Sequence, residues 1–166
     1  MIASMLPEAA DNSYRGYRLA LWLFGLVVVM KTGIGLNSIF NGRFVAVSAD
    51  GIALDSFGAA GADAVVSLLG IWGLAQVFIC VPCVVALVRY RALVPFMYGL
   101  LLLEHLSRRL FLAVMPIPRV GAPPGALVNV LLLSVMVVGL VLSFPRRAGR
   151  RPRAPYPGGA SNHDEP

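Results

Sequence analysis

Four ionisable residues fall within six positions of a strongly apolar stretch, LLLEHLSRRLFL at Leu101–Leu112. They are Glu104, His105, Arg108 and Arg109. In a helix, Glu104 and Arg108 are one turn apart in the order that favours an ion pair, and His105 and Arg109 repeat that spacing. The four occupy an arc of about 140° and leave the opposite face to leucines. The segment therefore predicts an amphipathic helix with one polar face in apolar surroundings.

The two cysteines of the chain, Cys80 and Cys83, have the C-x-x-C spacing in the apolar sequence ICVPCVV. In thiol–disulfide enzymes this spacing works when the first sulfur is an exposed thiolate. Apolar surroundings disfavour a thiolate, there is no second cysteine pair to relay electrons, and the cytosol keeps exposed thiols reduced. We therefore expect buried, unreactive thiols and no metal site, and keep redox chemistry at this pair as an alternative.

The composition indicates that most of this chain lies in lipid. Of its 166 residues, 58% are hydrophobic and only 13% are charged, whereas a soluble domain carries about 25% charge. Four apolar runs reach the length of about 20 residues that crosses a bilayer, and they are continuous, which favours helices over an alternating β-barrel. They lie near residues 19–40, 65–88, 93–115 and 125–144. The predicted fold class is an all-α membrane protein, an antiparallel four-helix transmembrane bundle over residues 19–144. Its second span is expected to pack through small residues, Gly70, Gly73 and Ala75.

Arginines gather on one side of these spans, which sets the orientation. They lie in the N-terminal arm (1–18), in the link after the second span and in the tail (145–166): Arg15, Arg18, Arg89, Arg91, Arg146, Arg147, Arg150, Arg151 and Arg153. The positive-inside rule then places both termini in the cytoplasm, and we expect a bacterial inner-membrane protein. The tail is rich in Pro, Gly and charge, which predicts disorder. Basic residues beside spans touch anionic lipid, so the net charge of +6 indicates membrane lipids as partners and no nucleic acid.

Depth along the spans identifies partners for the polar face. At 1.5 Å per residue, Lys31 in the first span lies about 20 Å from the cytoplasmic end and Glu104 about 18 Å, with Gln76 at a similar height. An unpaired charge at mid-bilayer costs about 2.5–3.5 kcal/mol. We therefore predict that Lys31 and Glu104 face the interior and pair, with Gln76 and His105 nearby.

The two arginines of the charged helix lie farther out than its glutamate. At about 24–26 Å from the cytoplasmic end, Arg108 and Arg109 can reach the outer headgroups. They complete the predicted polar or ligand-binding cluster as its outer members.

The longest outer link, residues 41–63, has two interpretations. Asp50–Gly51 separates two short semi-apolar stretches, which is a hairpin signal; a loop along the membrane surface fits equally well. Asp63 is placed to cap the second helix.

The layout of short spans, inward termini, a long first outer loop and a charged third helix resembles DoxX-like small bacterial membrane proteins over residues 19–144. The resemblance is one of layout and rests on no diagnostic motif; EHLSRR and FNGRF are the suggestive stretches. Because DoxX is associated with quinone-linked sulfur oxidation, the resemblance implies a quinone- or redox-coupled membrane component. No residue role is carried over from it.

From the residues themselves we expect a non-enzymatic accessory or structural membrane component with a buried polar cluster and no cofactor. The alternatives are a component that binds quinone as a cofactor, and a small transporter or proton pathway. A homo-oligomer and a partner membrane subunit both remain open.

Overall fold

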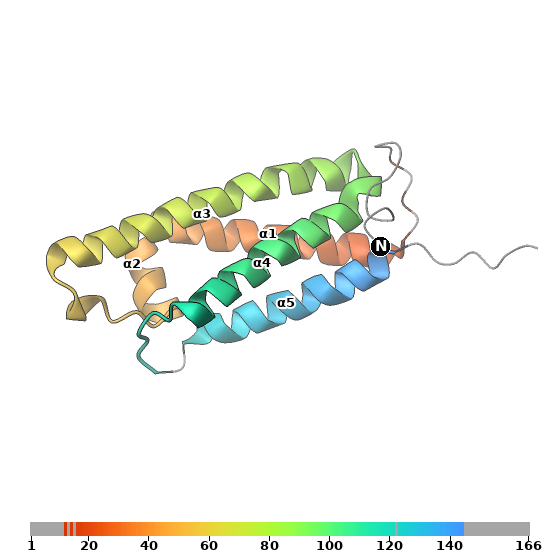
Figure 1. Ribbon diagram of the computed structural model, residues 1–166. Coiled ribbons are helices and arrows are strands. Elements are labelled where there is room, and N and C mark those ends of the chain that lie inside the picture. The colour runs from red at the N-terminus through yellow and green to blue at the C-terminus, as the bar shows by residue number, and fades with distance from the viewer. Residues whose placement is uncertain (1–11, 13, 15, 122, 145–166) are drawn as a thin grey trace, which may run out of the picture.

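The chain folds into helices in a computed structural model that describes residues 12, 14, 16–121 and 123–144. Figure 1 shows four long helices lying lengthwise beside one another, and no strand occurs among the described residues. The long helices are α1 (Arg18–Phe40), α3 (Ala59–Val88), α4 (Val94–Val114) and α5 (Pro124–Ser143). The predicted disordered tail at 145–166 and most of the arm at 1–18 lie outside the described residues.

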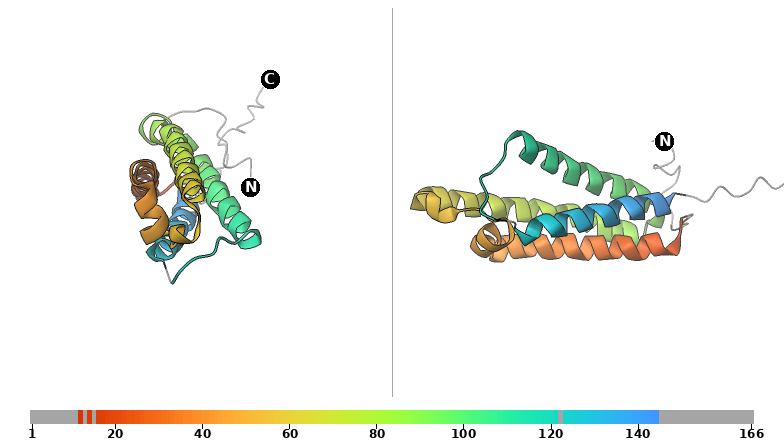
Figure 2. Two further views of the ribbon diagram at one scale, coloured as in Figure 1. Left: turned by 90° about the vertical axis from the view of Figure 1, so that its left-hand side faces the viewer. Right: turned by 90° about the horizontal axis from the view of Figure 1, so that it is seen from below.

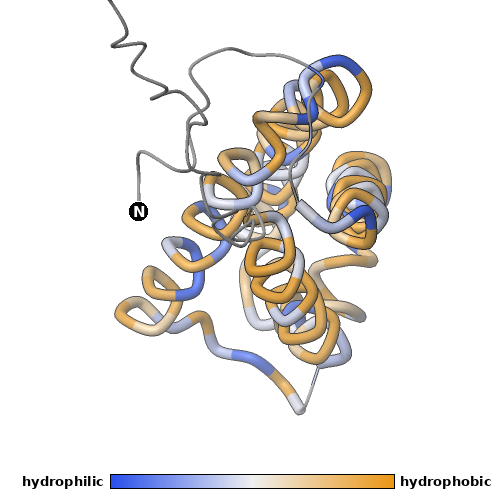
Figure 3. The backbone as a smooth tube through the Cα atoms, turned by 90° about the vertical axis from the view of Figure 1, so that its right-hand side faces the viewer, coloured by the Kyte–Doolittle hydropathy of each residue, from blue (hydrophilic) through white to orange (hydrophobic). Residues whose placement is uncertain are grey.

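Three of these helices, α1, α3 and α5, are long and apolar enough to cross a membrane. The fourth, α4, has 21 residues, but Glu104, Arg108 and Arg109 make it less apolar. Large apolar side chains are nevertheless exposed on all four, for example Val29 on α1 and Leu110 on α4. Figure 3 shows the same apolar character along the length of the helices. Exposed apolar surface on this scale is typical of a protein in lipid.

The helix that was predicted near residues 65–88 begins earlier than expected. α3 begins at Ala59 with Gly58 as its N-cap, so the prediction that Asp63 caps this helix is wrong. Helix-favouring alanines extend α3 by more than a turn toward the outer link. Asp63 instead lies exposed on the surface of α3, 3.7 Å from the guanidinium of Arg43. An ion pair this exposed adds little stability.

The link between α1 and α3 is a series of short helical turns, so the predicted hairpin is wrong. Gly51 does form a turn, with a left-handed φ of 68°. The chain before it stays helical, because Ala46, Ile52 and Leu54 become buried against Ala62 of α3. The Ile52 amide donates to the Ala46 carbonyl (2.8 Å) and closes this turn. The turns are α2 (Gly42–Phe44), the π-helix η2 (Val45–Ala49) and the 3₁₀-helix η3 (Leu54–Ser56).

α1 is the central helix of the structure and packs closely against α3 and α5. α4 packs mainly on α5 and touches α1 and α3 at few points. Figure 2 shows α4 diverging from the other helices toward its C-terminal end. At its other end α4 is anchored by Tyr98, whose hydroxyl donates to the Ala20 carbonyl (2.9 Å) and whose ring meets Phe24 edge-on at 4.8 Å.

The tight α1–α3 contact depends on two glycines that face each other, Gly35 and Gly73. A Cβ on Gly73 would lie 2.6 Å from the Gly35 carbonyl oxygen, and a Cβ on Gly35 would lie 2.8 Å from the Gly73 carbonyl oxygen. Of the small residues predicted to form the packing face of this span, only Gly73 does so. Gly70 faces open space and Ala75 is exposed.

We expect Gly73→Ala to lower the free energy of unfolding by about 1–3 kcal/mol, because backbone must move to admit the new methyl group. The measurement is chemical unfolding of the detergent-solubilised protein. The control is Gly70→Ala on the same helix, which should be neutral or slightly stabilising because alanine favours a helix. Equal effects of the two substitutions would contradict the close α1–α3 contact.

Asp50, in the link between α1 and α3, generates a pH prediction. Burial raises its pKa above the ordinary value of 3.8, against the opposing positive charges of Arg119 and Arg108. Ionising this carboxyl therefore destabilises the folded state, fully above the folded pKa and not at all once the pH falls below 3.8.

Asp50→Asn should accordingly raise the thermal midpoint at neutral pH, and the difference from wild type should vanish on acidification through that window. Thermal unfolding between pH 7 and 3 measures this difference. The control is Asp55→Asn, which changes an exposed aspartate of the same link. A gain that persists unchanged at the lowest pH would refute the assignment to the buried carboxylate.

Candidate functional site

The predicted ion pair between α1 and α4 is present. Lys31 Nζ lies 2.6 Å from Glu104 Oε2, and the side chains are 3% and 25% exposed. Because α4 touches α1 at few other points, this pair is a main link between the two helices. A buried pair with such short contact is costly to break, because the remaining charge keeps its desolvation penalty.

Gln76 of α3 is the second partner of the lysine. Lys31 Nζ donates to Gln76 Oε1 at 3.3 Å. An ammonium group can only donate, so the glutamine must turn its oxygen toward it. Its amide nitrogen Nε2 then points elsewhere, and it has no partner among the described residues. Gln76 is 4% exposed, which makes this a buried, unused donor.

Arg108 turns inward, so the prediction that it reaches the headgroups is wrong. Its guanidinium donates to Asn129 Oδ1 of α5 (3.1 Å) and lies over the ring of Trp72 of α3, 4.9 Å from the ring centroid. Its Nε is 3.9 Å from the Glu104 carboxylate, one turn away. The helix phase explains this direction, since residues four apart share a face. Arg109, the next residue, is exposed and does not join these contacts.

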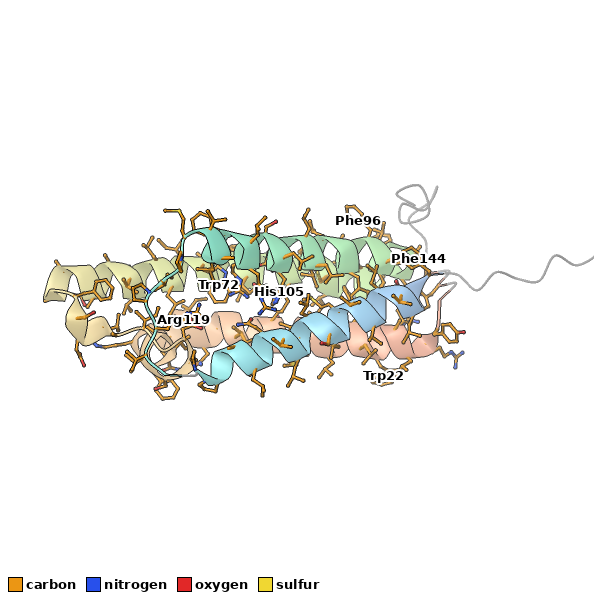
Figure 4. All side chains as sticks on the ribbon, turned by 60° about the horizontal axis from the view of Figure 1, so that its bottom comes forward. Trp22, Trp72, Phe96, His105, Arg119 and Phe144 are labelled. Atoms are coloured by element: carbon orange, nitrogen blue, oxygen red, sulfur yellow. The ribbon has the colours of Figure 1, made fainter. Side chains whose placement is uncertain are left out.

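His105 is fully buried and neither of its ring nitrogens has a partner among the described residues. Figure 4 shows it directed from α4 toward the interior. An unpaired buried polar group costs about 1–3 kcal/mol. His105 therefore lies beside the ion pair, as predicted, but in an unsatisfied state.

A small cavity of about 10 Å³ lies between the helices beside the ion pair. This is the space that one water molecule needs. All four long helices contribute to its lining, which consists of Lys31, Ile34, Trp72, Gln76, Arg108, Asn129 and Leu132. We call Lys31, Gln76, Glu104, His105, Arg108 and Asn129 the polar cluster.

Four residues that line the cavity were absent from the residues predicted for the site: Ile34, Trp72, Asn129 and Leu132. Trp72 precedes Gln76 by one helical turn and so shares its face. Asn129 is the one strongly polar residue of α5, and the argument that pairs Lys31 with a partner applies to it equally. Asn129 could therefore have been predicted from the sequence, as the polar residue on an otherwise apolar helix.

The cysteines lie in the core, away from the cavity lining. Cys80 and Cys83 are both free and buried. The Cys83 thiol donates to the Ile79 carbonyl of its own helix (3.2 Å). This environment offers no exposed thiolate for disulfide exchange. Among the described residues, no group of three His, Cys, Asp or Glu side chains could hold a metal ion.

Comparison with protein-family models, with curated proteins and with solved structures gives no match for this chain. The class of this protein is therefore defined by its fold and its site alone. The protein is helical, with three helices able to span a membrane and a buried polar cluster between helices.

We expect the partners of the ion pair to respond unequally to neutralisation. Glu104→Gln should cost more stability than Lys31→Met, because Lys31 would then be buried with only an amide oxygen beside it, whereas Glu104 keeps Arg108 nearby. Breaking a buried pair costs about 3–5 kcal/mol. The double variant should cost less than the sum of the single ones. Unfolding in detergent measures the cycle, and strictly additive losses would contradict a direct pair.

Proposed function

We propose that this chain is a multi-pass protein of the bacterial inner membrane, an antiparallel four-helix transmembrane bundle with a non-enzymatic accessory or structural role. The observation that carries the proposal is the Lys31–Glu104 pair, 2.6 Å long, which joins two helices through a buried lysine and a partly buried glutamate. It neutralises Glu104, one of the three charges that would otherwise keep α4 out of lipid. Three further helices of membrane-spanning length and apolarity support the same arrangement.

The two faces of α4 are suited to a bilayer. Its charged residues at positions 104 and 108 turn toward the other helices, while Leu103, Leu106 and Leu110 are exposed. A lone charge at the bilayer centre costs about 2.5–3.5 kcal/mol. Pairing inside the bundle removes most of this cost, and the leucines meet the lipid chains.

The proposed orientation places both termini and the link after α3 in the cytoplasm. Arg89 and Arg91 flank that link, in agreement with the positive-inside rule. At the same end of the structure, Trp22 is 80% exposed (Figure 4), and Tyr17 is exposed beside it in the chain. Tryptophan and tyrosine favour the membrane interface. An accessory role would act through lipids, a second copy or a partner membrane subunit on the exposed apolar faces.

A second candidate function is the handling of a polar ligand inside the bundle. The unpartnered nitrogens of His105 and Gln76 favour it, because a structural network satisfies its own polar groups. A quinone, in line with the DoxX-like layout, would offer carbonyl oxygens to such donors. A small transporter or proton pathway would use the same residues. Quinone that is retained in the purified protein would favour quinone binding. Solute or proton uptake into proteoliposomes would favour a transporter or proton pathway if Glu104→Gln abolishes that uptake.

Single cysteines in the links test whether α4 crosses the membrane. We expect a membrane-impermeant maleimide to label Ser56→Cys and Ile117→Cys in intact spheroplasts, and Tyr90→Cys only after lysis. The wild-type chain is the control, since Cys80 and Cys83 are buried. If α4 stays on one side, Ile117→Cys will follow the pattern of Tyr90→Cys, and the four-span bundle is wrong. Native mass spectrometry from the membrane then tests for a partner subunit.

A further inference from the structure

The cavity between the four helices carries an excess of positive charge. Lys31 and Arg108 line it, and one carboxylate, Glu104, is shared between them at 2.6 and 3.9 Å. Farther out, Asp50 and Arg119 contribute one charge of each sign. Two cations and one shared anion leave one positive charge uncompensated beside the cavity. Such a charge in apolar surroundings is expensive unless something of opposite sign joins it.

The hydrogen-bonding capacity left over in the cavity consists of donors. Gln76 uses its oxygen on Lys31, so its Nε2 is free to donate. Asn129 likewise uses its oxygen on Arg108, which leaves its amide nitrogen as a donor. Arg108 Nε is buried and has no hydrogen-bond partner among the described residues, since the Glu104 carboxylate lies 3.9 Å away. Lysine and arginine carry no acceptor. A ligand must therefore bring acceptors.

We propose that this cavity binds a small anionic group, an oxygen of an acidic lipid headgroup or a free inorganic anion. Gln76 Nε2, Arg108 Nε and the Asn129 amide would donate to it, and it would neutralise the excess charge. The site goes beyond the structural role proposed above and does not depend on it.

The size and position of the cavity limit what enters. About 10 Å³ admits one water-sized group, so a single anionic oxygen fits and the rest of the ligand stays outside, whereas a bromide ion is too large. α4 diverges from the other helices toward its C-terminal end (Figure 2), and the cavity itself is partly open. A water molecule would satisfy two donors but would leave the charge unbalanced.

Two neighbouring arginines provide a matched test. Arg108→Gln and Arg109→Gln remove the same charge from adjacent positions of α4, but only Arg108 lines the cavity. Full-length protein in uncharged detergent is titrated with inorganic phosphate, against sodium bromide at equal ionic strength as the anion too large for the cavity, and the thermal midpoint is followed. In parallel, protein from phosphatidylcholine nanodiscs with and without phosphatidylglycerol is examined by native mass spectrometry for retained lipid.

We expect saturable anion binding in wild type and Arg109→Gln, and binding about ten- to hundredfold weaker in Arg108→Gln, the effect of one charged hydrogen bond. Gln76→Leu keeps the charge and removes one donor; it should also weaken binding, and it carries the test if Arg108→Gln does not fold. A midpoint shift with phosphate and not with bromide identifies a free anion. Retained phosphatidylglycerol without such a shift identifies a headgroup.

Three results would overturn the proposal. Wild-type protein that responds to neither free anions nor phosphatidylglycerol would leave the cavity to water alone. Equal loss of binding in Arg108→Gln and Arg109→Gln would mean that net charge, not the cavity, attracts the anion. Unchanged binding in both Arg108→Gln and Gln76→Leu would place the anion elsewhere.

Discussion

The lysine–glutamate pair between α1 and α4 is the interaction on which the position of the charged helix depends. α4 packs mainly on α5, touches the other helices at few points and diverges from them at its C-terminal end. Near the start of α4, Tyr98 anchors the helix to the backbone of α1. Farther along, the ion pair between the side chains of Lys31 and Glu104 provides a second anchor. Without that second anchor, the Glu104 carboxylate would have only Arg108, 3.9 Å away, as a counter-charge, and its desolvation would oppose the packing of α4.

The close α1–α3 packing brings the third member of this arrangement into place. Gly35 lies one turn beyond Lys31 on α1, and its partner Gly73 lies three residues before Gln76 on α3. With no Cβ at either glycine, the two backbones approach until Gln76 comes within hydrogen-bonding distance of the lysine. A steric feature of two glycines thus determines a polar contact nearby. The same contact orients the glutamine amide and leaves its nitrogen as an unused donor.

The sequence predicts the Lys31–Glu104 pair, but it does not predict the direction of Arg108 or the form of the link between α1 and α3. Pairing of Lys31 with Glu104 followed from depth and from the cost of a lone charge, both of which depend only on position along a helix. Arg108 was misplaced because a long side chain at that depth can reach outward or inward with equal ease. Trp72 and Asn129 decided the direction, and they come from two other helices. The hairpin interpretation was wrong because Ile52 and Leu54 are buried against Ala62 of α3. That contact joins the link to the following helix, and the local pattern around Gly51 does not predict it.

By itself the sequence determined the helical character, the approximate extent of the long helices and the level at which polar residues meet. These properties follow from apolar run length, proline and glycine positions and the fixed rise of a helix. Only the tertiary structure decided which faces meet, that Arg108 belongs to the interior and Arg109 does not, and that the polar capacity left in the cavity lining consists of donors. The rotation of one helix against another depends on side-chain packing across several helices at once, and no local pattern along the chain contains that information.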